Sequence, residues 1–229
     1  MVLLKDVKMK YPGSRAETLR DIDLTIQDGE FVFLVGPSGS GKTTIIKLLT
    51  GEIRATGGQI EVNGFDLRTM KRRNLPKLRR SLGVIFQDYR LIKDMTVYEN
   101  VAFAMRVIGA SNREIKKRVP YVLDLVDLSG REDRYPRELS GGEQRRVAIA
   151  RALVNSPDMI IADEPTGNLD PARSLEIMLL FQKINELGTT VLIVTHEKEL
   201  VNAFSKRVVS LSDGCLISDG MDGYYGYES

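Results

Sequence analysis

Hydrophobic and polar residues follow two different patterns in the first third of the chain, and both patterns predict strands. Residues 22–26 alternate between apolar and polar, which is typical of a strand with one buried face. Residues 31–35 are apolar throughout, as expected for a strand that is buried on both faces. Gly57-Gly58 and Asn63-Gly64 flank a short strand predicted at 59–62, and this arrangement indicates a β-hairpin.

Farther along the chain, apolar residues recur every three or four positions, which is the period of an amphipathic helix. This spacing predicts helices over residues 44–50, 97–108, 115–126, 140–154 and 171–187. Shorter apolar runs predict buried strands over 159–162 and 190–194. Strands and helices therefore alternate at both ends of the chain, and a helical block lies between them.

This order predicts an α/β domain that carries a helical insertion. We expect a core lobe with a mixed sheet over about residues 1–87 and 158–218, and a helical subdomain over about residues 88–157. The tail, residues 219–229, is rich in glycine, tyrosine and acidic residues, so we expect it to be loosely ordered.

The composition is that of an ordinary globular protein of 229 residues, with 42% hydrophobic and 28% charged residues. A formal net charge of +2 is too small to imply a nucleic-acid partner, and the basic segments 71–73 and 77–80 are interpreted as a solvated helical face. The single cysteine, Cys215, excludes an internal disulfide and fits a reducing compartment. Residues 1–6 do not resemble a signal peptide, and no apolar run approaches the roughly eighteen residues that span a bilayer. We therefore expect a soluble, cytoplasmic protein that can dock onto a membrane protein.

A glycine-rich loop follows the strand predicted at 31–35 and precedes the helix predicted at 44–50. Its glycines allow successive backbone N–H groups to surround phosphate oxygens at the positive end of that helix. Lys42 is placed to reach the β- and γ-phosphates of ATP, and the Thr43 hydroxyl is placed to ligate Mg²⁺. The candidate nucleotide-binding residues of this loop are Gly36, Pro37, Ser38, Gly39, Ser40, Gly41, Lys42, Thr43 and Thr44.

Two adjacent carboxylates, Asp163 and Glu164, follow the strand predicted at 159–162. Such a pair at the end of a buried strand is costly unless a cation compensates it. Neighbouring strand residues point to opposite sides, so the two side chains are expected to act differently. We expect Asp163 to hold Mg²⁺, directly or through water, and Glu164 to polarise the attacking water as the general base.

A second candidate anion site begins the helix predicted at 140–154. The spacing of Ser140 and Glu143 is that of a capping box, which explains these two residues. Capping does not explain Gly141 and Gly142, which remove side chains from the helix N-terminus and allow backbone N–H groups to approach an anion. The chain thus has two phosphate-binding helix starts, and both can serve one nucleotide only if the second comes from another copy of the chain.

Residues 139–143 resemble the signature motif of the ATP-binding-cassette (ABC) ATPases, a class of P-loop NTPases, and the whole chain matches that family in the order of its motifs. The resemblance implies that Tyr11 stacks on adenine and that Gln87 is the glutamine at the junction with the helical insertion. It also implies that His196, the only histidine, contacts the γ-phosphate, and that residues 168–170 form the D-loop. The implied nucleotide-binding residues outside the glycine loop are Tyr11, Gln87, Ser140, Gly141, Gly142 and Asp170. The predicted catalytic residues are Lys42, Gln87, Glu164 and His196, and the predicted Mg²⁺ ligands are Thr43, Gln87 and Asp163.

A narrower resemblance is to a branch of this family that acts in cell division in Gram-positive bacteria. It is carried by residues 86–91, 97–101, 162–171 and 223–227. The resemblance implies a head-to-tail homodimer that sandwiches two ATP molecules, closes on ATP binding and opens after hydrolysis. It further implies that the dimer lies on the inner face of the cell membrane beneath a membrane protein, and that closure controls peptidoglycan hydrolases. We expect a cytoplasmic helix of that partner to dock on residues 88–98.

Three alternatives share part of this pattern. An exporter ATPase for lipoproteins or macrolides carries the same motif at 162–170, and the identity of the membrane partner separates it from the cell-division branch. Chromosome-maintenance and DNA-repair ATPases carry a long coiled coil before the signature motif, whereas no sustained heptads occur here. Ribosome-binding ABC factors carry two cassettes in one chain, and this chain has one. One residue, Arg145, departs from the branch, in which glutamine is commoner at that position; it lies after the signature core and casts no doubt on ATP binding.

Overall fold

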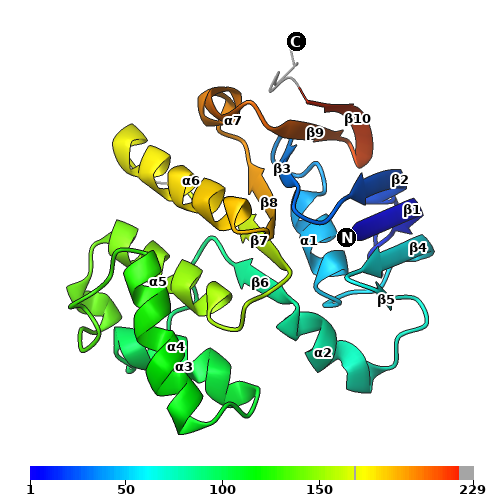
Figure 1. The fold of residues 1–229 in the computed structure, drawn as a ribbon. Coiled ribbons are helices and arrows are strands. Elements are labelled where there is room, and N and C mark those ends of the chain that lie inside the picture. Colours follow the sequence, from blue (N-terminus) through cyan, green and yellow to red (C-terminus); the bar gives the residue numbers. More distant parts are fainter. Residues whose placement is uncertain (168, 222–229) are drawn as a thin grey trace.

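The computed structural model describes residues 1–167 and 169–221, which form two sheets with a group of helices to one side (Figure 1). Asn168 and the tail motif at 223–227 lie outside the described residues. Within the described part, the larger sheet has six strands in the order β10-β9-β3-β8-β7-β6. The smaller sheet has four strands in the order β2-β1-β4-β5.

The larger sheet positions the candidate chemistry. Its strands are β3 (Phe31–Val35), β6 (Leu82–Ile85), β7 (Met159–Asp163), β8 (Thr190–Thr195), β9 (Arg207–Ser212) and β10 (Cys215–Gly220). All neighbouring strands from β9 to β6 are parallel, and β10 is antiparallel to β9. The carboxyl ends of β3, β7 and β8 therefore meet at one edge of the sheet, which is where open α/β sheets bind ligands. The glycine loop, the acidic pair and His196 follow these three strands.

The smaller sheet is antiparallel and consists of β1 (Val2–Met9), β2 (Leu19–Ile26), β4 (Gly57–Val62) and β5 (Phe65–Asp66). The predicted hairpin is confirmed, because β4 pairs with β5 and Val62 lies opposite Phe65. Asn63 and Gly64 have φ angles of 48° and 79°, the left-handed values that a tight two-residue hairpin turn requires.

The helices are α1 (Lys42–Leu49), α2 (Leu75–Arg80), α3 (Val97–Val107), α4 (Asn112–Leu125), α5 (Gly141–Leu153), α6 (Pro171–Glu186) and α7 (Lys198–Phe204), with 3-10 turns η1 (Arg72–Asn74) and η2 (Pro136–Glu138). All five predicted helices are confirmed to within a few residues at each end. Helices α3, α4 and α5 pack together in the region drawn in green in Figure 1. They lie inside the predicted helical subdomain, whose boundaries stay a prediction. In the described part of the chain, no helix is both long enough and apolar enough to cross a membrane.

Strand β3 is buried on both faces, as its unbroken apolar run predicts. Phe31, Phe33 and Val35 pack in a core that includes side chains of α3 to α6. Val32 and Leu34 pack in a second core with side chains of α1 and the smaller sheet. The strand that leads into the glycine loop is therefore held from both sides.

The short strand β6 has no counterpart among the sequence predictions, and neither do β1, α7, β9 and β10. A Cβ atom at Gly83 would lie 2.4 Å from Cδ1 of Ile160 and 2.7 Å from the carbonyl oxygen of Ala152. Glycine at this position therefore lets α5 pack closely on β6 and β7. A four-residue strand that contains glycine carries little sequence signal.

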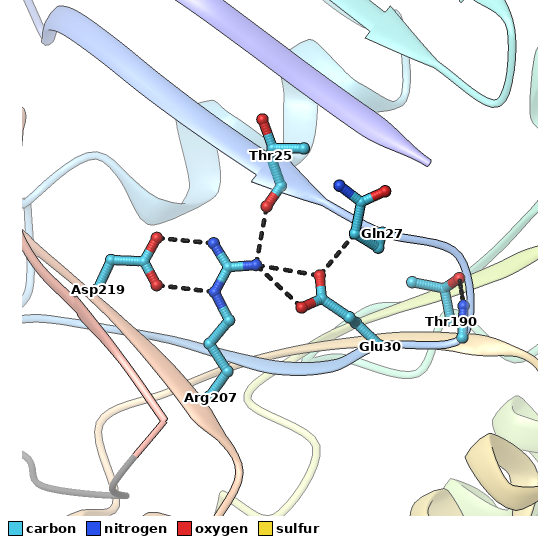
Figure 2. A network of polar contacts seen from close by, with 7 residues as sticks. Thr25, Gln27, Glu30, Thr190, Arg207 and Asp219 are labelled. Atoms are coloured by element: carbon cyan, nitrogen blue, oxygen red, sulfur yellow. Dashed lines mark hydrogen bonds and ion pairs between the residues drawn. The ribbon is translucent and has the colours of Figure 1, made fainter.

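The expectation of a loosely ordered tail from residue 219 is wrong for its first two residues, because Asp219 and Gly220 belong to β10. Arg207 on β9 donates from Nε and Nη2 to the two carboxylate oxygens of Asp219, over 2.7 and 2.6 Å (Figure 2). Its Nη1 atom donates to Glu30 and to the carbonyl oxygen of Thr25. The hydrogen bond to Asp219 is the largest of the effects that raise the pKa of Arg207. This bidentate pair fixes β10 against β9.

The basic segment at 71–80 forms η1 and α2. Leu78 is fully buried, whereas Lys77, Arg79 and Arg80 are exposed. The interpretation as a solvated helical face is therefore confirmed.

Candidate nucleotide-binding and hydrolysis site

The glycine loop connects β3 to α1 and has a backbone shape that requires glycine at two buried positions. Gly36 and Gly41 have φ angles of 149° and 112°. A Cβ atom at Gly36 would lie 2.1 Å from the carbonyl oxygen of Leu211, and one at Gly41 would lie 2.6 Å from Cδ2 of Leu19. Among the described residues, no side chain caps the first N–H groups of α1, and its first turn holds no acidic residue. The loop therefore offers N–H groups to an anion at the positive end of the helix.

Lys42 is the first residue of α1, and its ammonium group lies against the loop. Nζ donates to the carbonyl oxygens of Gly36 and Pro37 over 2.7 and 2.8 Å. Burial lowers the pKa of Lys42, while the negative charges of Glu164 and Asp163 act in the opposite direction. A partly desolvated ammonium group beside the loop is well placed to bind phosphate oxygens.

Asp163 ends β7 in a place where its negative charge is disfavoured. Burial raises the pKa of Asp163, and the charge of Glu164 raises it further. The charge of Lys42 opposes both effects. A cation beside this carboxylate would offset the cost of ionising it.

Glu164 lies one residue beyond β7, and its conformation corrects the argument from strand alternation. Its φ angle of 48° is left-handed, and its backbone N–H donates to the carbonyl oxygen of Val194 over 2.8 Å. The direction of the side chain is therefore set by a turn and not by alternation along a strand. The side chain is 13% exposed, and its buried Oε2 atom has no hydrogen-bond partner among the described residues.

His196 follows β8 and contacts the other carboxylate oxygen of Glu164. Its Nδ1 atom lies 2.7 Å from Oε1. The imidazole ring is 67% exposed, whereas the carboxylate is largely buried. The pair occupies Oε1 and leaves Oε2 as an acceptor for another donor.

These groups line one cleft with a volume of about 650 Å³. Its lining is Thr18, Pro37, Ser38, Gly39, Gly41, Lys42, Thr43, Thr44, Gln87, Asp163, Glu164 and His196. All four predicted catalytic residues and all three predicted Mg²⁺ ligands are thus brought together. Thr18 was not predicted, because no local pattern marks it; it reaches the cleft through the position of the turn before β2.

Three predicted nucleotide-binding residues in or before the glycine loop lie outside this lining. Gly36 and Ser40 are buried behind the exposed part of the loop. The hydroxyl oxygen of Tyr11 lies 3.3 Å from Oγ1 of Thr44, which is itself part of the lining. The tyrosine ring is therefore at the side of the cleft and half-buried.

The predicted signature residues also lie outside the cleft. Ser140 caps α5, and its hydroxyl and N–H both donate to Glu143, over 2.8 and 2.9 Å, which confirms the capping box. A Cβ atom at Gly141 would meet no described atom within 4 Å, and one at Gly142 would meet only Cδ of Arg173, at 4.0 Å. Packing within the described chain therefore does not require these two glycines.

Asp170, the remaining predicted nucleotide-binding residue, caps α6. Its Oδ1 atom accepts a hydrogen bond from the backbone N–H of Arg173 over 3.0 Å, and its side chain is exposed. It does not contribute to the lining of the cleft.

Comparison with known proteins identifies the class to which this site belongs. The profile of the ABC transporter family matches residues 19–167, which include the glycine loop, the signature segment and the acidic pair. The chain belongs to the ABC transporter family and is an ATPase of that family.

Similar proteins share a more particular description. The chain is 51% identical over 226 residues to the cell division ATP-binding protein FtsE of Bacillus subtilis, with 99% of each chain covered. It is 50% identical over 228 residues to FtsE of Mycobacterium tuberculosis, with 100% of this chain and 99% of that protein covered. It is 46% identical over 216 residues to FtsE of Escherichia coli, with 94% of this chain and 97% of that protein covered. The resemblance to the cell-division branch is therefore confirmed.

Solved structures of similar proteins have the same fold. One is the dimeric ATP-binding cassette MJ0796 in a post-hydrolysis state bound to ADP and Pi, with a TM-score of 0.86, 36% identity, and 96% of this chain and 98% of that chain covered. Another is cbiO1 from Clostridium perfringens, with a TM-score of 0.89, 32% identity, and 96% and 87% covered. The predicted fold class, an ABC nucleotide-binding domain, is confirmed.

Proposed function

We propose that this chain is the ATPase subunit of a cell-division complex and works as a homodimer bound to the membrane protein FtsX on the inner face of the cell membrane. ATP-driven closure of the dimer would control peptidoglycan hydrolases through FtsX. One observation carries the proposal: the cleft gathers all the predicted catalytic residues and Mg²⁺ ligands, while Ser140, Gly141 and Gly142 lie outside it and the two glycines are not required by packing. The assignment to cell division is supported by relatives named FtsE that match nearly the full length of the chain.

The glycine loop and Lys42 hold the phosphates of ATP in this proposal. The N–H groups at the start of α1 and the ammonium group of Lys42 together offer positive charge along one side of the cleft. Tyr11 stacks on the adenine ring from the side of the cleft, next to Thr44.

Thr43, Gln87 and Asp163 are the proposed ligands of Mg²⁺. Their hydroxyl, amide and carboxylate oxygens are hard donors of the kind that this ion prefers. The raised pKa of Asp163 supports the assignment, because a bound cation would offset the cost of its negative charge. When bound, Mg²⁺ supplies positive charge against the oxygens of the β- and γ-phosphates.

Glu164 is the proposed general base, and His196 holds it in place. Oε1 contacts the imidazole and Oε2 is buried, so the carboxylate must turn and expose one oxygen before it accepts a proton from the attacking water. An ionised Glu164 accepts from Nδ1–H, so Nε2 of His196 donates to the γ-phosphate only when both ring nitrogens carry a proton. Gln87 lines the same cleft and is placed to orient the water.

The second half of each ATP site comes from the other copy of the chain. Gly141 and Gly142 offer backbone N–H groups that no side chain at these positions obstructs, whereas the N–H and hydroxyl of Ser140 already donate to Glu143 and must be released to bind the nucleotide. In a head-to-tail dimer these groups complete the cleft of the partner copy, and Asp170 contributes from the D-loop of that copy. The solved dimer of MJ0796, bound to ADP and Pi, supports this arrangement.

A groove beside Gln87 is the proposed docking site for a cytoplasmic helix of FtsX. It has a volume of about 710 Å³ and is lined in part by Phe86, Arg90 and Ile92, within or next to the segment where docking is expected. Phe103 and Val107 on α3 line its other side and are 40% and 66% exposed. Apolar side chains exposed to this extent, beside the arginines that line the same groove, are suited to bind an amphipathic helix.

The test is co-purification of the full chain with FtsX. Val107→Asp and Phe103→Asp, both in the groove, should abolish capture of FtsX without lowering the ATPase rate of the isolated chain. Leu187→Asp is the matched control, because Leu187 is 67% exposed and lies outside the groove. Unchanged capture by the groove variants would refute the docking site. Capture of a lipoprotein or macrolide exporter in place of FtsX would refute the role in cell division.

A further inference from the structure

Arg145 is a fully buried arginine on α5, one turn beyond the capping box of Ser140. It is 1% exposed and is the largest of the fully buried side chains described. In the described part of the chain, no carboxylate forms an ion pair with it. A buried guanidinium group without such a partner calls for an explanation other than stability.

The guanidinium group joins two segments that are far apart in the sequence. Nη2 donates to the hydroxyl of Tyr89 over 2.5 Å and to the carbonyl oxygen of Gly167 over 2.8 Å. The guanidinium carbon also lies 4.9 Å from the centre of the Tyr89 ring. Nε and Nη1 have no hydrogen-bond partner among residues 1–167 and 169–221. Burial accordingly lowers the pKa of Arg145, and this is the largest effect on it.

The first of these segments is the turn that follows Gln87. Tyr89 and Arg90 have φ angles of 56° and 47°, so two successive residues other than glycine are left-handed. Arg151, also on α5, donates to the carbonyl oxygens of Tyr89 and Arg90, each over 2.6 Å. Two arginines of one helix therefore hold this strained turn in place.

The second segment is the turn that presents Glu164. The N–H of Gly167 donates to the carbonyl oxygen of Glu164 over 3.2 Å, and Glu164 is itself left-handed. Thr166, also in this turn, donates from its hydroxyl to Glu197 over 2.6 Å, next to His196. A shift of Gly167 would therefore move the backbone that aims the carboxylate of Glu164.

We propose that Arg145 is a positioning residue for ATP hydrolysis, which couples the turn after Gln87 to the turn that presents Glu164. This inference rests on the proposed function, in which both residues act on the γ-phosphate. Movement of the helical region that carries α5 is transmitted through Arg145 to both turns together. The signature segment at the start of the same helix and the general base consequently change position together.

Steady-state kinetics of the full chain test this coupling. Arg145→Met keeps a long side chain but removes every hydrogen-bond donor, so neither Tyr89 nor Gly167 is held and kcat should fall about tenfold. The KM for ATP and the affinity for a fluorescent ATP analogue should stay within about twofold, because the glycine loop is untouched. Arg118→Met is the matched control and should leave kcat unchanged, since among the described residues Arg118 donates to Leu153, Val154 and Ser156, at and beyond the far end of α5, and stacks on Tyr121.

Tyr89→Phe supplies an independent readout that keeps the ring and removes only the hydroxyl acceptor. It should lower kcat by less than Arg145→Met, and the double variant should be no slower than Arg145→Met alone. Unchanged kcat in Tyr89→Phe, or additive losses in the double variant, would overturn the proposal, even if Arg145→Met does not fold. A fall in kcat matched by an equal loss of ATP affinity would overturn it as well. Normal turnover by Glu164→Gln would instead refute the proposed function on which it rests.

Discussion

The Nδ1 atom of His196 lies 2.7 Å from Oε1 of Glu164, although the two residues follow different strands of the larger sheet. Strands β7 and β8 are parallel neighbours, so the residues after them meet at the same edge. The left-handed turn at Glu164 then directs its carboxylate toward the imidazole. The pairing depends on both features, and the other carboxylate oxygen, Oε2, is buried without a hydrogen-bond partner among the described residues.

Glu164→Gln should bind ATP and hydrolyse it roughly 10²–10⁴ times more slowly, because an amide cannot accept the proton of the attacking water. ATP should then accumulate in the closed dimer. Phosphate release measures the rate, and size-exclusion chromatography with ATP measures the dimer. Glu199→Gln, at an exposed site on α7, serves as the control and should turn over normally. Phosphate release near the wild-type rate would remove Glu164 from the role of base.

Ser140→Arg and Lys42→Ala should complement each other when the two variants are mixed. Each alone should be inactive, because every site of its homodimer lacks one half. A mixed dimer has one intact site, so activity should return to roughly a quarter of the wild-type value if subunits pair at random. A titration of one variant against the other, followed by phosphate release, measures this.

The same two variants separate binding from hydrolysis. Ser140→Arg alone should keep its affinity for ATP, whereas Lys42→Ala should lose it, because Ser140 acts on the nucleotide of the other copy. If mixing restored no activity, or if Ser140→Arg lost as much affinity as Lys42→Ala, the head-to-tail arrangement would be wrong.

Asp163→Asn should stabilise the nucleotide-free protein at neutral pH. Burial and the charge of Glu164 raise the pKa of Asp163 in the folded state, so the folded state binds its proton more tightly than the unfolded state does. The destabilisation caused by the charged Asp163 side chain is therefore absent below the ordinary aspartate pKa of about 3.9. It appears as the pH rises through the folded-state pKa of Asp163.

Urea unfolding at several pH values tests the direction of this pH dependence. The advantage of Asp163→Asn over the wild type should be largest near pH 7 and should shrink as the pH falls toward 4. Asp158→Asn, at an exposed site just before β7, provides the comparison. An advantage that grows as the pH falls would contradict the assigned direction.

Gly83→Ala should destabilise the protein by about 1–3 kcal/mol, because the added methyl group overlaps backbone and side-chain atoms in a packed interior. Its Cβ atom would lie 2.7 Å from the carbonyl oxygen of Ala152, which cannot move without shifting α5. Gly220→Ala meets no described atom within 4 Å and should leave the free energy of unfolding unchanged. Chemical denaturation measures both, and equal stability of the two variants would show that α5 can move away from β6.

The sequence predicted much of this site because its motifs are local. Each of Lys42, Asp163, Glu164 and His196 begins, ends or directly follows a regular element, and the parallel order of three strands brings them together. The left-handed backbone of Glu164 was not predictable from strand alternation, because the chain leaves the extended conformation at Glu164 itself, directly after β7. The bond between Arg145 and Gly167 was likewise hidden, since it depends on a contact between distant segments.

The topology of β3 has a consequence for folding during synthesis. Its two neighbours in the sheet, β8 and β9, both come from the last quarter of the chain, and Gly36 packs against the carbonyl oxygen of Leu211 on β9. A nascent chain that has already exposed the glycine loop therefore lacks the strands that give the loop its shape. Such long-range parallel pairing is slow to form. The loop therefore takes its final shape only after β8 and β9 have been synthesised and have paired with β3, so a fragment that lacks both strands should bind ATP more weakly than the chain that contains them.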